Sequence, residues 1–334
     1  MELSEDGLVA AIRTVLSGET SGVIVGLGDD AAVVEPGTGS SVLTTDLLVD
    51  GVHFERGSTS ARDLGAKAIA VNVSDIAAMG ASPRYALASL ALPSDIEAAW
   101  VVELYGGMRA ACDEYALALV GGDLSRAERL VISVMVLGEV SRGHAVTREG
   151  ARAGDAIVVT GSLGAAAAGL ALSRAPAPVL LAALSAGWAR ELLDALARPA
   201  ARVGEGVTLA QCGATAMMDL SDGVAKDLSR LCIASGVGAR VRLADVPIPE
   251  AVRAAAAALA VDPLDLAISG GEDYELLATI APTEVDGARE RLRDRFGLAL
   301  TRVGDIVEGQ GLVAVDAHGA ESTMEPKGWD HFAG

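Results

Sequence analysis

The sequence predicts an α/β protein of two domains with α+β-like layers, in which a β-rich sheet domain precedes an α/β domain. Apolar runs alternate with helix-like stretches in both halves, which is typical of layered folds. The 334 residues are enough for two domains of ordinary size. The composition becomes polar and turn-rich over 141–154, which indicates a junction. We therefore expect domains over 1–145 and 146–334.

Five strands and three helices are expected in the first half. In chain order they are a helix over 4–16, strands at 23–28, 31–34 and 41–46, helices over 61–79 and 94–115, and strands at 116–122 and 130–140. Each of the two longer helices begins at a predicted capping box, formed by Ser60 with Asp63 and by Ser94 with Glu97. Gly80 marks the end of the first of them.

The second half repeats the alternation of strands and helices. The expected elements are a strand at 155–161, helices near 163–173 and 178–197, a strand at 215–219, a helix from about 222, a strand from 238, a helix over 249–260, a strand at 274–280, a helix over 284–295 and a final strand at 300–307. The segment 324–334 is irregular but contains Trp329 and Phe332. This aromatic pair indicates that the segment docks on the protein.

Composition limits the possible partners and the cellular location. The net charge is −19, from 45 acidic and 26 basic side chains, which argues against nucleic acid and membrane surfaces as partners. No apolar run reaches the roughly 20 residues of a membrane span, and no leader is evident, so a cytoplasmic protein is expected. The three cysteines stand singly, which predicts neither a disulfide framework nor a zinc site.

The recurring chemical feature is an aspartate at the point where an apolar run becomes a turn. The aspartates in such positions are Asp29, Asp30, Asp46, Asp123, Asp219 and Asp222. Asp75 differs, because it lies in the expected 61–79 helix, three residues after Asn72 and on the same face. One acidic turn is explained by turn chemistry alone. Several carboxylates in a half-buried cleft repel one another unless a cation joins them, and Mg²⁺ shared with phosphates fits best.

Other phosphate-binding patterns fit poorly. Residues 26–31 satisfy G-x-G-x-x-A, but a strand and a turn follow them instead of a helix, and aspartates occupy the phosphate positions. No G-x-x-x-x-G-K-[ST] motif occurs, so metals and an arginine such as Arg148 would have to supply positive charge. His53 follows the acidic TTD turn, near the expected metals, although a lone histidine of this kind is more often structural.

The chain contains, in order, the motifs GLGDDAAVV, LTTDLLVDGVHF, LGAKAIAVNVSDIAAMGA, LVGGDLSR, VTREGARAGD, VTGSLG, MMDLSDGVAKDL, SGGEDYELL and KGWDHF. This set, which runs from about residue 24 to the last residues, resembles the thiamine-monophosphate kinase family. Any single motif is weakly specific, whereas the ordered set is highly specific. Within the wider superfamily of aminoimidazole-ribonucleotide synthetase and selenophosphate synthetase, DGVHF, GGEDYEL and KGWDHF indicate the thiamine enzyme.

The resemblance implies transfer of the ATP γ-phosphoryl group to thiamine monophosphate, with several Mg²⁺ ions and ATP as co-substrate. It also implies a homodimer formed by pairing of the N-terminal sheets. The implied Mg²⁺ ligands are Asp30, Thr44, Thr45, Asp46, Asp75, Asp123, Asp219 and Asp222. The implied ATP contacts are Tyr105, Gly122, Asp123, Arg148 and Ser221. The implied thiamine phosphate contacts are His53, Glu272 and Trp329. The residues expected to act in catalysis are Asp46, Asp75, Asp123 and Arg148.

Two alternatives are left open. The first is another ATP-using enzyme of the superfamily, similar to aminoimidazole-ribonucleotide synthetase. Selenophosphate synthetase would need a reactive cysteine in the N-terminal loop, and none precedes Cys112; a hydrogenase-maturation relative would end in a functional cysteine, where this sequence reads DHFAG. The second is a nucleotide-binding regulator without turnover, which the retained carboxylates and hydroxyls disfavour.

Overall fold

The computed structural model describes residues 5–17, 21–27, 31–175 and 185–329. The chain forms two compact units. The first comprises Met1–Ile76 and Ala81–Gly143, and the second comprises Ala77–Gly80 and His144–Gly334. Each unit combines a sheet with helices, which confirms the expected two-domain α/β fold.

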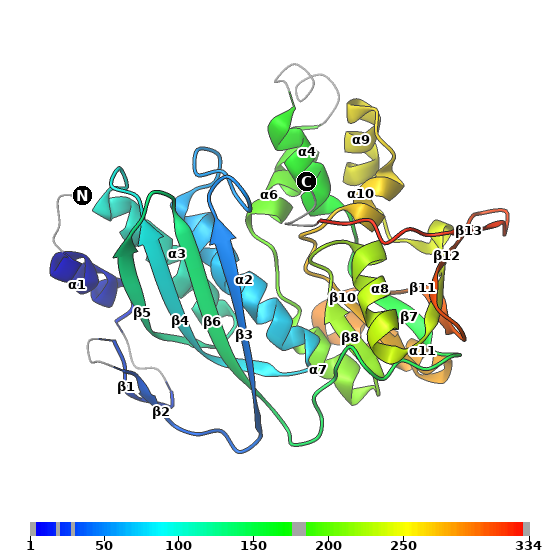
Figure 1. Ribbon diagram of the computed structural model, residues 1–334, viewed down its shortest axis with the longest axis horizontal. Helices are drawn as coiled ribbons and strands as arrows, with labels where there is room; N and C mark the ends of the chain where they lie inside the picture. Colours follow the sequence, from blue (N-terminus) through cyan, green and yellow to red (C-terminus); the bar gives the residue numbers. More distant parts are fainter. Residues whose placement is uncertain (1–4, 18–20, 28–30, 176–184, 330–334) are drawn as a thin grey trace. The chain divides into compact units, whose positions relative to one another are not determined.

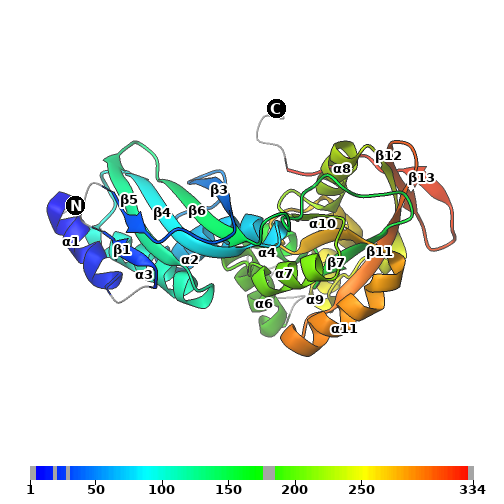
Figure 2. The same cartoon turned by 90° about the horizontal axis from the view of Figure 1, so that it is seen from below.

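The first unit contains a four-stranded sheet in the order β3-β6-β4-β5. Its elements are α1 (Glu5–Val15), β1 (Val23–Val25), β2 (Val33–Val34), β3 (Ser40–Val49), α2 (Ala61–Ala78), β4 (Ser82–Leu92), α3 (Ala98–Glu114), β5 (Ala118–Arg126) and β6 (Val131–Val140). Strands β4 and β5 run parallel, and the other pairs are antiparallel. Figures 1 and 2 show α2 and α3 together on one face of this sheet.

Of the two predicted capping boxes, the one at the start of α2 is present and the one at the start of α3 is not. The hydroxyl of Ser60 donates to Asp63 Oδ2 at 2.6 Å and accepts from the Asp63 N–H at 3.1 Å, as the capping box at the start of α2 predicts. The predicted box at Ser94 is wrong. Helix α3 begins at Ala98, and its N-cap residue Glu97 makes no side-chain capping bond. Ser94 lies instead in a turn closed by the Ile96 N–H and the Pro93 carbonyl.

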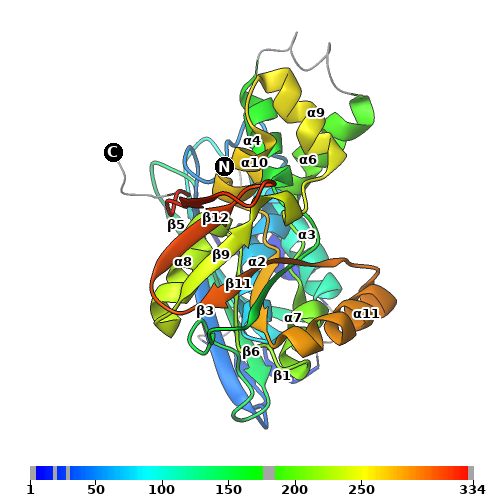
Figure 3. The ribbon, with the colours of Figure 1, turned by 90° about the vertical axis from the view of Figure 1, so that its right-hand side faces the viewer.

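The second unit contains a seven-stranded sheet in the order β13-β12-β9-β11-β7-β10-β8. Figure 3 shows its strands β12, β9 and β11 side by side. Its strands are β7 (Ala156–Thr160), β8 (Ala216–Asp219), β9 (Gly238–Arg242), β10 (Leu276–Ile280), β11 (Leu300–Val307), β12 (Gly311–Val315) and β13 (Glu321–Thr323). The sheet is antiparallel except for the pair of β12 and β9. Strands β12 and β13 were not predicted, so the expectation that 300–307 is the final strand is wrong.

Helices cover both faces of this sheet. They are α4 (Ala165–Arg174), α6 (Ala186–Ala197), α7 (Val203–Gln211), α8 (Val224–Ser235), α9 (Glu250–Leu259), α10 (Pro263–Ser269) and α11 (Val285–Phe296). One apolar core joins the sheet to α8 and α10, and a second joins the opposite face to α7 and α11, which Figure 2 shows on opposite sides. A third core lies among α4, α6 and α9.

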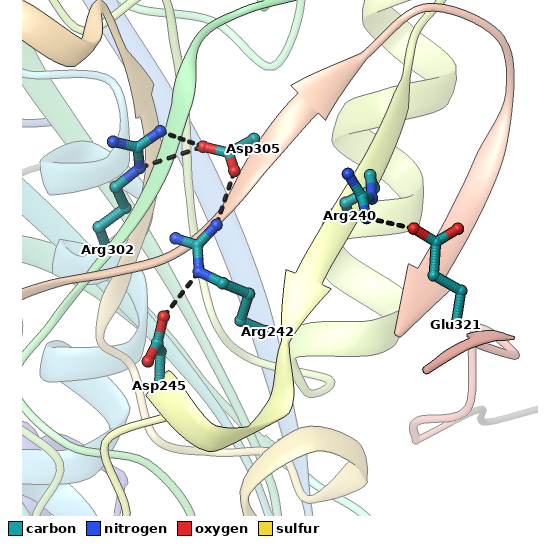
Figure 4. A network of polar contacts seen from close by, with 6 residues as sticks. All are labelled: Arg240, Arg242, Asp245, Arg302, Asp305 and Glu321. Carbon is teal, nitrogen blue, oxygen red and sulfur yellow. Dashed lines mark hydrogen bonds and ion pairs between the residues drawn. The ribbon is translucent and has the colours of Figure 1, made fainter. Parts of the chain in front are cut away.

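Ion pairs connect the charged side chains of β9 to those of β11 and β13 in the same sheet. Figure 4 shows Asp305 accepting hydrogen bonds from both Arg302 and Arg242, while Arg242 also donates to Asp245. Burial raises the pKa of Asp305, but the hydrogen bonds and charges of Arg302 and Arg242 outweigh that effect and hold it below its ordinary value. A separate pair joins Arg240 to Glu321 on β13. Ionic contacts therefore stabilise this part of the sheet.

No helix within the described residues is long and apolar enough to cross a lipid bilayer.

Candidate functional site

The first group of predicted site residues joins β3 to α2. Thr44 and Asp46 lie two residues apart on β3 and so share a face of the sheet. The Thr44 hydroxyl donates to Asp75 Oδ2 at 2.5 Å, and the Asp46 N–H donates to Asn72 Oδ1 at 2.8 Å. Asn72 is fixed in turn by a bond from Nδ2 to the Ala68 carbonyl at 2.9 Å. The shared helical face of Asn72 and Asp75 thus meets β3, and we call Thr44, Asp46 and Asp75 the β3–α2 cluster.

The electrostatics of the β3–α2 cluster are those of two carboxylates held close together. Burial, followed by the charge of Asp75, raises the pKa of Asp46 from 3.8 to about 6. A divalent cation would relieve this repulsion. The oxygen donors available, two carboxylates and a hydroxyl, are those that Mg²⁺ prefers.

Thr45 and His53 lie near this cluster in sequence but have other contacts. Thr45 is on the opposite face of β3, where its hydroxyl donates to the Val134 carbonyl at 3.0 Å. His53 Nδ1 accepts from the Val49 N–H at 3.0 Å, which orients the ring at the end of β3. The structure therefore does not bring the Thr45 side chain to the cluster.

A cavity of about 690 Å³ in the first unit gathers three further predicted residues. Tyr105 from α3 and both Gly122 and Asp123 from β5 line it, together with apolar side chains of α1, β4 and β6. A Cβ atom on Gly122 would lie 1.8 Å from the Ala88 carbonyl oxygen, so only glycine allows β5 to approach β4 here. Burial, with the Asp123 charge adding to it, raises the pKa of the Tyr105 phenol above its ordinary value.

In the second unit, two segments that contain predicted site residues, 219–222 and 271–275, are joined by backbone hydrogen bonds. The pairing continues the β8–β10 ladder beyond Asp219, which is opposite Leu276. The Glu272 N–H donates to the Ser221 carbonyl at 2.9 Å, and the Tyr274 N–H donates to the Leu220 carbonyl at 3.0 Å. Ser221 and Glu272 are thereby held at neighbouring positions.

Asp222 is surrounded by charge. Arg230 Nη1 lies 2.7 Å from Asp222 Oδ2 and 2.9 Å from Asp227 Oδ1, and Lys226 Nζ lies 3.6 Å from Asp222. Asp227, fully buried, accepts from the N–H groups of Asp222 and Gly223 at 3.0 and 3.1 Å. Burial, with the Asp222 charge adding to it, raises the pKa of Asp227 to about 6, although the Asp222 N–H and Arg230 oppose the shift. Asp227 and Arg230 thus fix both the backbone and the carboxylate of Asp222.

The C-terminal segment reaches the same turn. The Trp329 N–H donates to the Asp222 carbonyl at 3.2 Å, and Lys226 donates to the Trp329 carbonyl. Trp329 is 45% exposed. The expected docking of this segment holds for Trp329, whereas Phe332 lies outside the described residues.

Two predicted site residues belong to none of the groups described above. Arg148 is exposed in a loop, where its carbonyl accepts from the Ser235 hydroxyl at 3.0 Å. Asp30 lies outside the described residues. Within the part of the chain that the structure describes, no three His, Cys, Asp or Glu side chains form a ready metal site.

Sequence reasoning missed four charged residues that support the site. Asp227 and Arg230 follow the acidic turn at helical spacing, and this i, i+3 pattern was a usable signal. Asp273 and Glu275 lie within the SGGEDYELL motif, but their hydrogen-bond partners come from distant parts of the sequence. No local pattern could identify those partners.

Comparisons with known proteins identify the family of the chain. Residues 28–140 match the family AIR synthase related protein, N-terminal domain, and residues 152–317 match AIR synthase related protein, C-terminal domain. A thiamine-monophosphate kinase of Aquifex aeolicus is 38% identical over 337 residues, which cover 99% of each chain. This chain belongs to the thiamine-monophosphate kinase family.

Solved structures of the family have the same fold. The thiamine-monophosphate kinase from Stenotrophomonas maltophilia superposes with a TM-score of 0.81 at 38% identity, covering 94% of this chain and 97% of that one. The structure of AaThiL complexed with AMPPCP and TMP superposes with a TM-score of 0.78 at 36% identity, covering 99% and 98%. Both therefore match the full two-domain architecture of this chain.

Proposed function

We propose that this protein transfers the γ-phosphoryl group of ATP to thiamine monophosphate, giving thiamine diphosphate and ADP. The observation that carries the proposal is the β3–α2 cluster, in which Asp46 and Asp75 are held together beside the Thr44 hydroxyl. Membership of the family and the relative complexed with AMPPCP and TMP support the choice of both substrates.

Mg²⁺ is the cation proposed for this reaction. Asp46, Asp75 and the Thr44 hydroxyl would hold it in the first unit, and Asp30, Asp123, Asp219 and Asp222 are the further proposed ligands; the Thr45 side chain lies on the opposite face of β3 and is not among them. When bound, Mg²⁺ neutralises charge on the phosphates during transfer. The raised pKa of Asp46 is compatible with this assignment, because burial and then the charge of Asp75 disfavour its carboxylate, and a bound cation would offset both effects.

The acceptor needs little activation. A phosphate monoester is already ionised at neutral pH, so no strong general base is required. The protein's task is to hold two anions in line and to reduce the repulsion between them. We propose direct in-line transfer, in which Asp46, Asp75 and Asp123 act through the metal and Arg148 contacts ATP.

The cavity beside β5 is the proposed nucleotide site. Its apolar side chains suit a base, and Asp123 lies at its wall beside the flat backbone that Gly122 allows. Tyr105 is buried and lines this cavity.

His53, Glu272 and Trp329 are proposed to bind thiamine monophosphate. The half-exposed Trp329 indole offers a stacking surface for a cationic heterocycle. We expect His53→Ala and Trp329→Ala to raise the KM for thiamine monophosphate with less effect on the KM for ATP. Equal effects on both substrates would remove these residues from the thiamine end.

A homodimer and a cytoplasmic location are also proposed. On β3 the side chains of Leu43 and Leu47 are 64% and 51% exposed, and they alternate with the residues on the α2 face. An exposed apolar sheet face supports pairing with a second copy. Leu43→Asp should shift the mass in light scattering from dimer to monomer; a monomeric parent protein would contradict the dimer.

A coupled assay of ADP release tests the function. With ATP and Mg²⁺, release should depend on thiamine monophosphate and should stop when EDTA is added. Nucleotide binding without turnover would favour the regulator, and release only with another phosphorylated acceptor would favour a different enzyme of the superfamily.

A further inference from the structure

The backbone of the GGEDYE segment adopts an unusual conformation at two residues that are not glycine. Glu272 has φ 68° and Tyr274 has φ 50°, both in the left-handed region. Such φ values are unfavourable for residues with a side chain and persist only where surrounding contacts impose them. Glu272 is also a proposed substrate contact, so the contacts that hold this turn bear on the reaction.

One of these contacts is supplied by Asp273, which lies between the two strained residues. Its carboxylate accepts from the Gly164 N–H at 2.8 Å and from the Ala166 N–H at 3.4 Å, at the start of α4. The N-cap residue of α4 is Gly164, which offers no side-chain cap. Asp273 therefore caps α4 from a segment more than a hundred residues away and tethers the turn to a helix end that favours negative charge.

The contact between Asp273 and α4 also argues against phosphate binding by the glycine-rich TGSLG segment. A glycine-rich turn before a helix can bind a phosphate through its N–H groups. Here the Asp273 carboxylate occupies that position. The start of α4 therefore serves as an anchor for the 272–274 turn.

A second anchor follows directly. Glu275, buried at 4% exposure, receives bonds from Arg202 Nε at 2.9 Å and Arg202 Nη2 at 2.6 Å. The Thr160 hydroxyl donates to the same carboxylate at 2.6 Å. Because Arg202 and Thr160 fix Glu275 and the start of α4 fixes Asp273, the backbone between these two residues has little freedom.

We propose that Asp273 is a positioning residue for the acceptor-binding end of the site. By capping α4 it holds the left-handed backbone at Glu272, and so the direction in which the Glu272 carboxylate is presented. The inference rests on the proposed role of Glu272 toward thiamine monophosphate. Burial raises the pKa of Asp273 to about 7, while the N–H groups of Gly164 and Ala166 at the start of α4 oppose this shift.

The first test is kinetic. Asp273→Asn keeps the size of the side chain but removes the charge and places an NH₂ group against backbone N–H donors. It should raise the KM for thiamine monophosphate at least tenfold while the KM for ATP stays within about threefold. Ser185→Ala, which removes the side-chain cap of α6, is the matched control and should leave both values unchanged. Unchanged KM values in Asp273→Asn, or equal increases for both substrates, would overturn the proposal.

The second test is independent of turnover. Asp273→Asn should lower the urea midpoint in the parent protein and in a Glu272→Gln background. In a Glu272→Gly background the loss should be larger, because a residue with a side chain can relax its unfavourable positive φ once the cap is lost, which offsets part of the loss, whereas glycine has no such strain to release. Equal losses in all three backgrounds would overturn the positioning role. If the parent protein fails to phosphorylate thiamine monophosphate, the proposed function fails, and this cycle still decides whether Asp273 holds the turn.

Discussion

Replacing Asp46 with asparagine should make the protein more stable at neutral pH while abolishing phosphoryl transfer. The folded-state pKa of Asp46 is about 6, against 3.8 for the unconstrained group, so its ionised form is disfavoured in the native protein. At roughly 1.4 kcal/mol per pKa unit this difference is about 3 kcal/mol, and solvent screening of a partly exposed side chain reduces it to about 1–3 kcal/mol. Asparagine avoids this penalty and leaves the bond from the residue 46 N–H to Asn72 in place.

The sign of the pH dependence follows from the raised pKa. Well below pH 3.8 the carboxyl is protonated in both states, so the parent protein and Asp46→Asn should be about equally stable. As the pH rises from 4 to 6, the native state alone resists ionisation, and the parent loses stability that the variant keeps.

Urea unfolding at several pH values measures this difference, with and without Mg²⁺. Mg²⁺ should stabilise the parent protein and have a smaller effect on Asp46→Asn. Asp113→Asn is the control, because Asp113 lies on α3 in an exposed pair with Arg109 and its loss should lower stability by less than about 1 kcal/mol. A variant of Asp46 that is less stable than the parent at pH 7, or that keeps near-normal activity, would refute the reasoning.

Three further substitutions probe the supports of the fold and site. Gly122→Ala puts a methyl group against the Ala88 carbonyl and should cost about 1–3 kcal/mol in urea unfolding and weaken binding of an ATP analogue; unchanged binding would place the nucleotide elsewhere. Arg202→Met leaves Glu275 buried without its partner and should cost about 3–5 kcal/mol, most of which the double variant with Glu275→Gln should restore. Glu321→Gln, by contrast, breaks only the exposed pair with Arg240, drawn in Figure 4, and should change the free energy of unfolding by less than about 1 kcal/mol; a larger loss would contradict the small contribution expected of an exposed ion pair.

Elements with strong local signals could be predicted from the sequence. The Ser60 capping box located the start of α2, and the β-branched run at 130–140 located β6. The central strand β4 was missed, because SPRYALASLAL contains no β-branched residue and resembles a helix in composition. It is a strand because both β5 and β6 pair with it, which is a tertiary effect. Helix α10 was also not predicted, although the sequence contains a start signal for it, because Asp262 caps the helix and Pro263 is its first residue.

The candidate site divides in the same way. The i, i+3 spacing of Asn72 and Asp75 predicted their shared face, and strand alternation separates Thr45 from Thr44 and Asp46. The roles of Asp273 and Glu275 depend on partners 109 and 115 residues away in the sequence. Such pairings arise from the topology of the second unit, and periodicity along the chain cannot show them.

The most direct test of the proposed activity follows the γ-phosphoryl group itself. The protein is incubated with Mg²⁺, thiamine monophosphate and ATP labelled at the γ-phosphate, and the products are separated after acid quenching at early times. We predict that the label passes to thiamine diphosphate in step with ADP formation, with none retained on the protein. Label found only in inorganic phosphate, or trapped covalently on the protein, would contradict direct transfer between the two substrates.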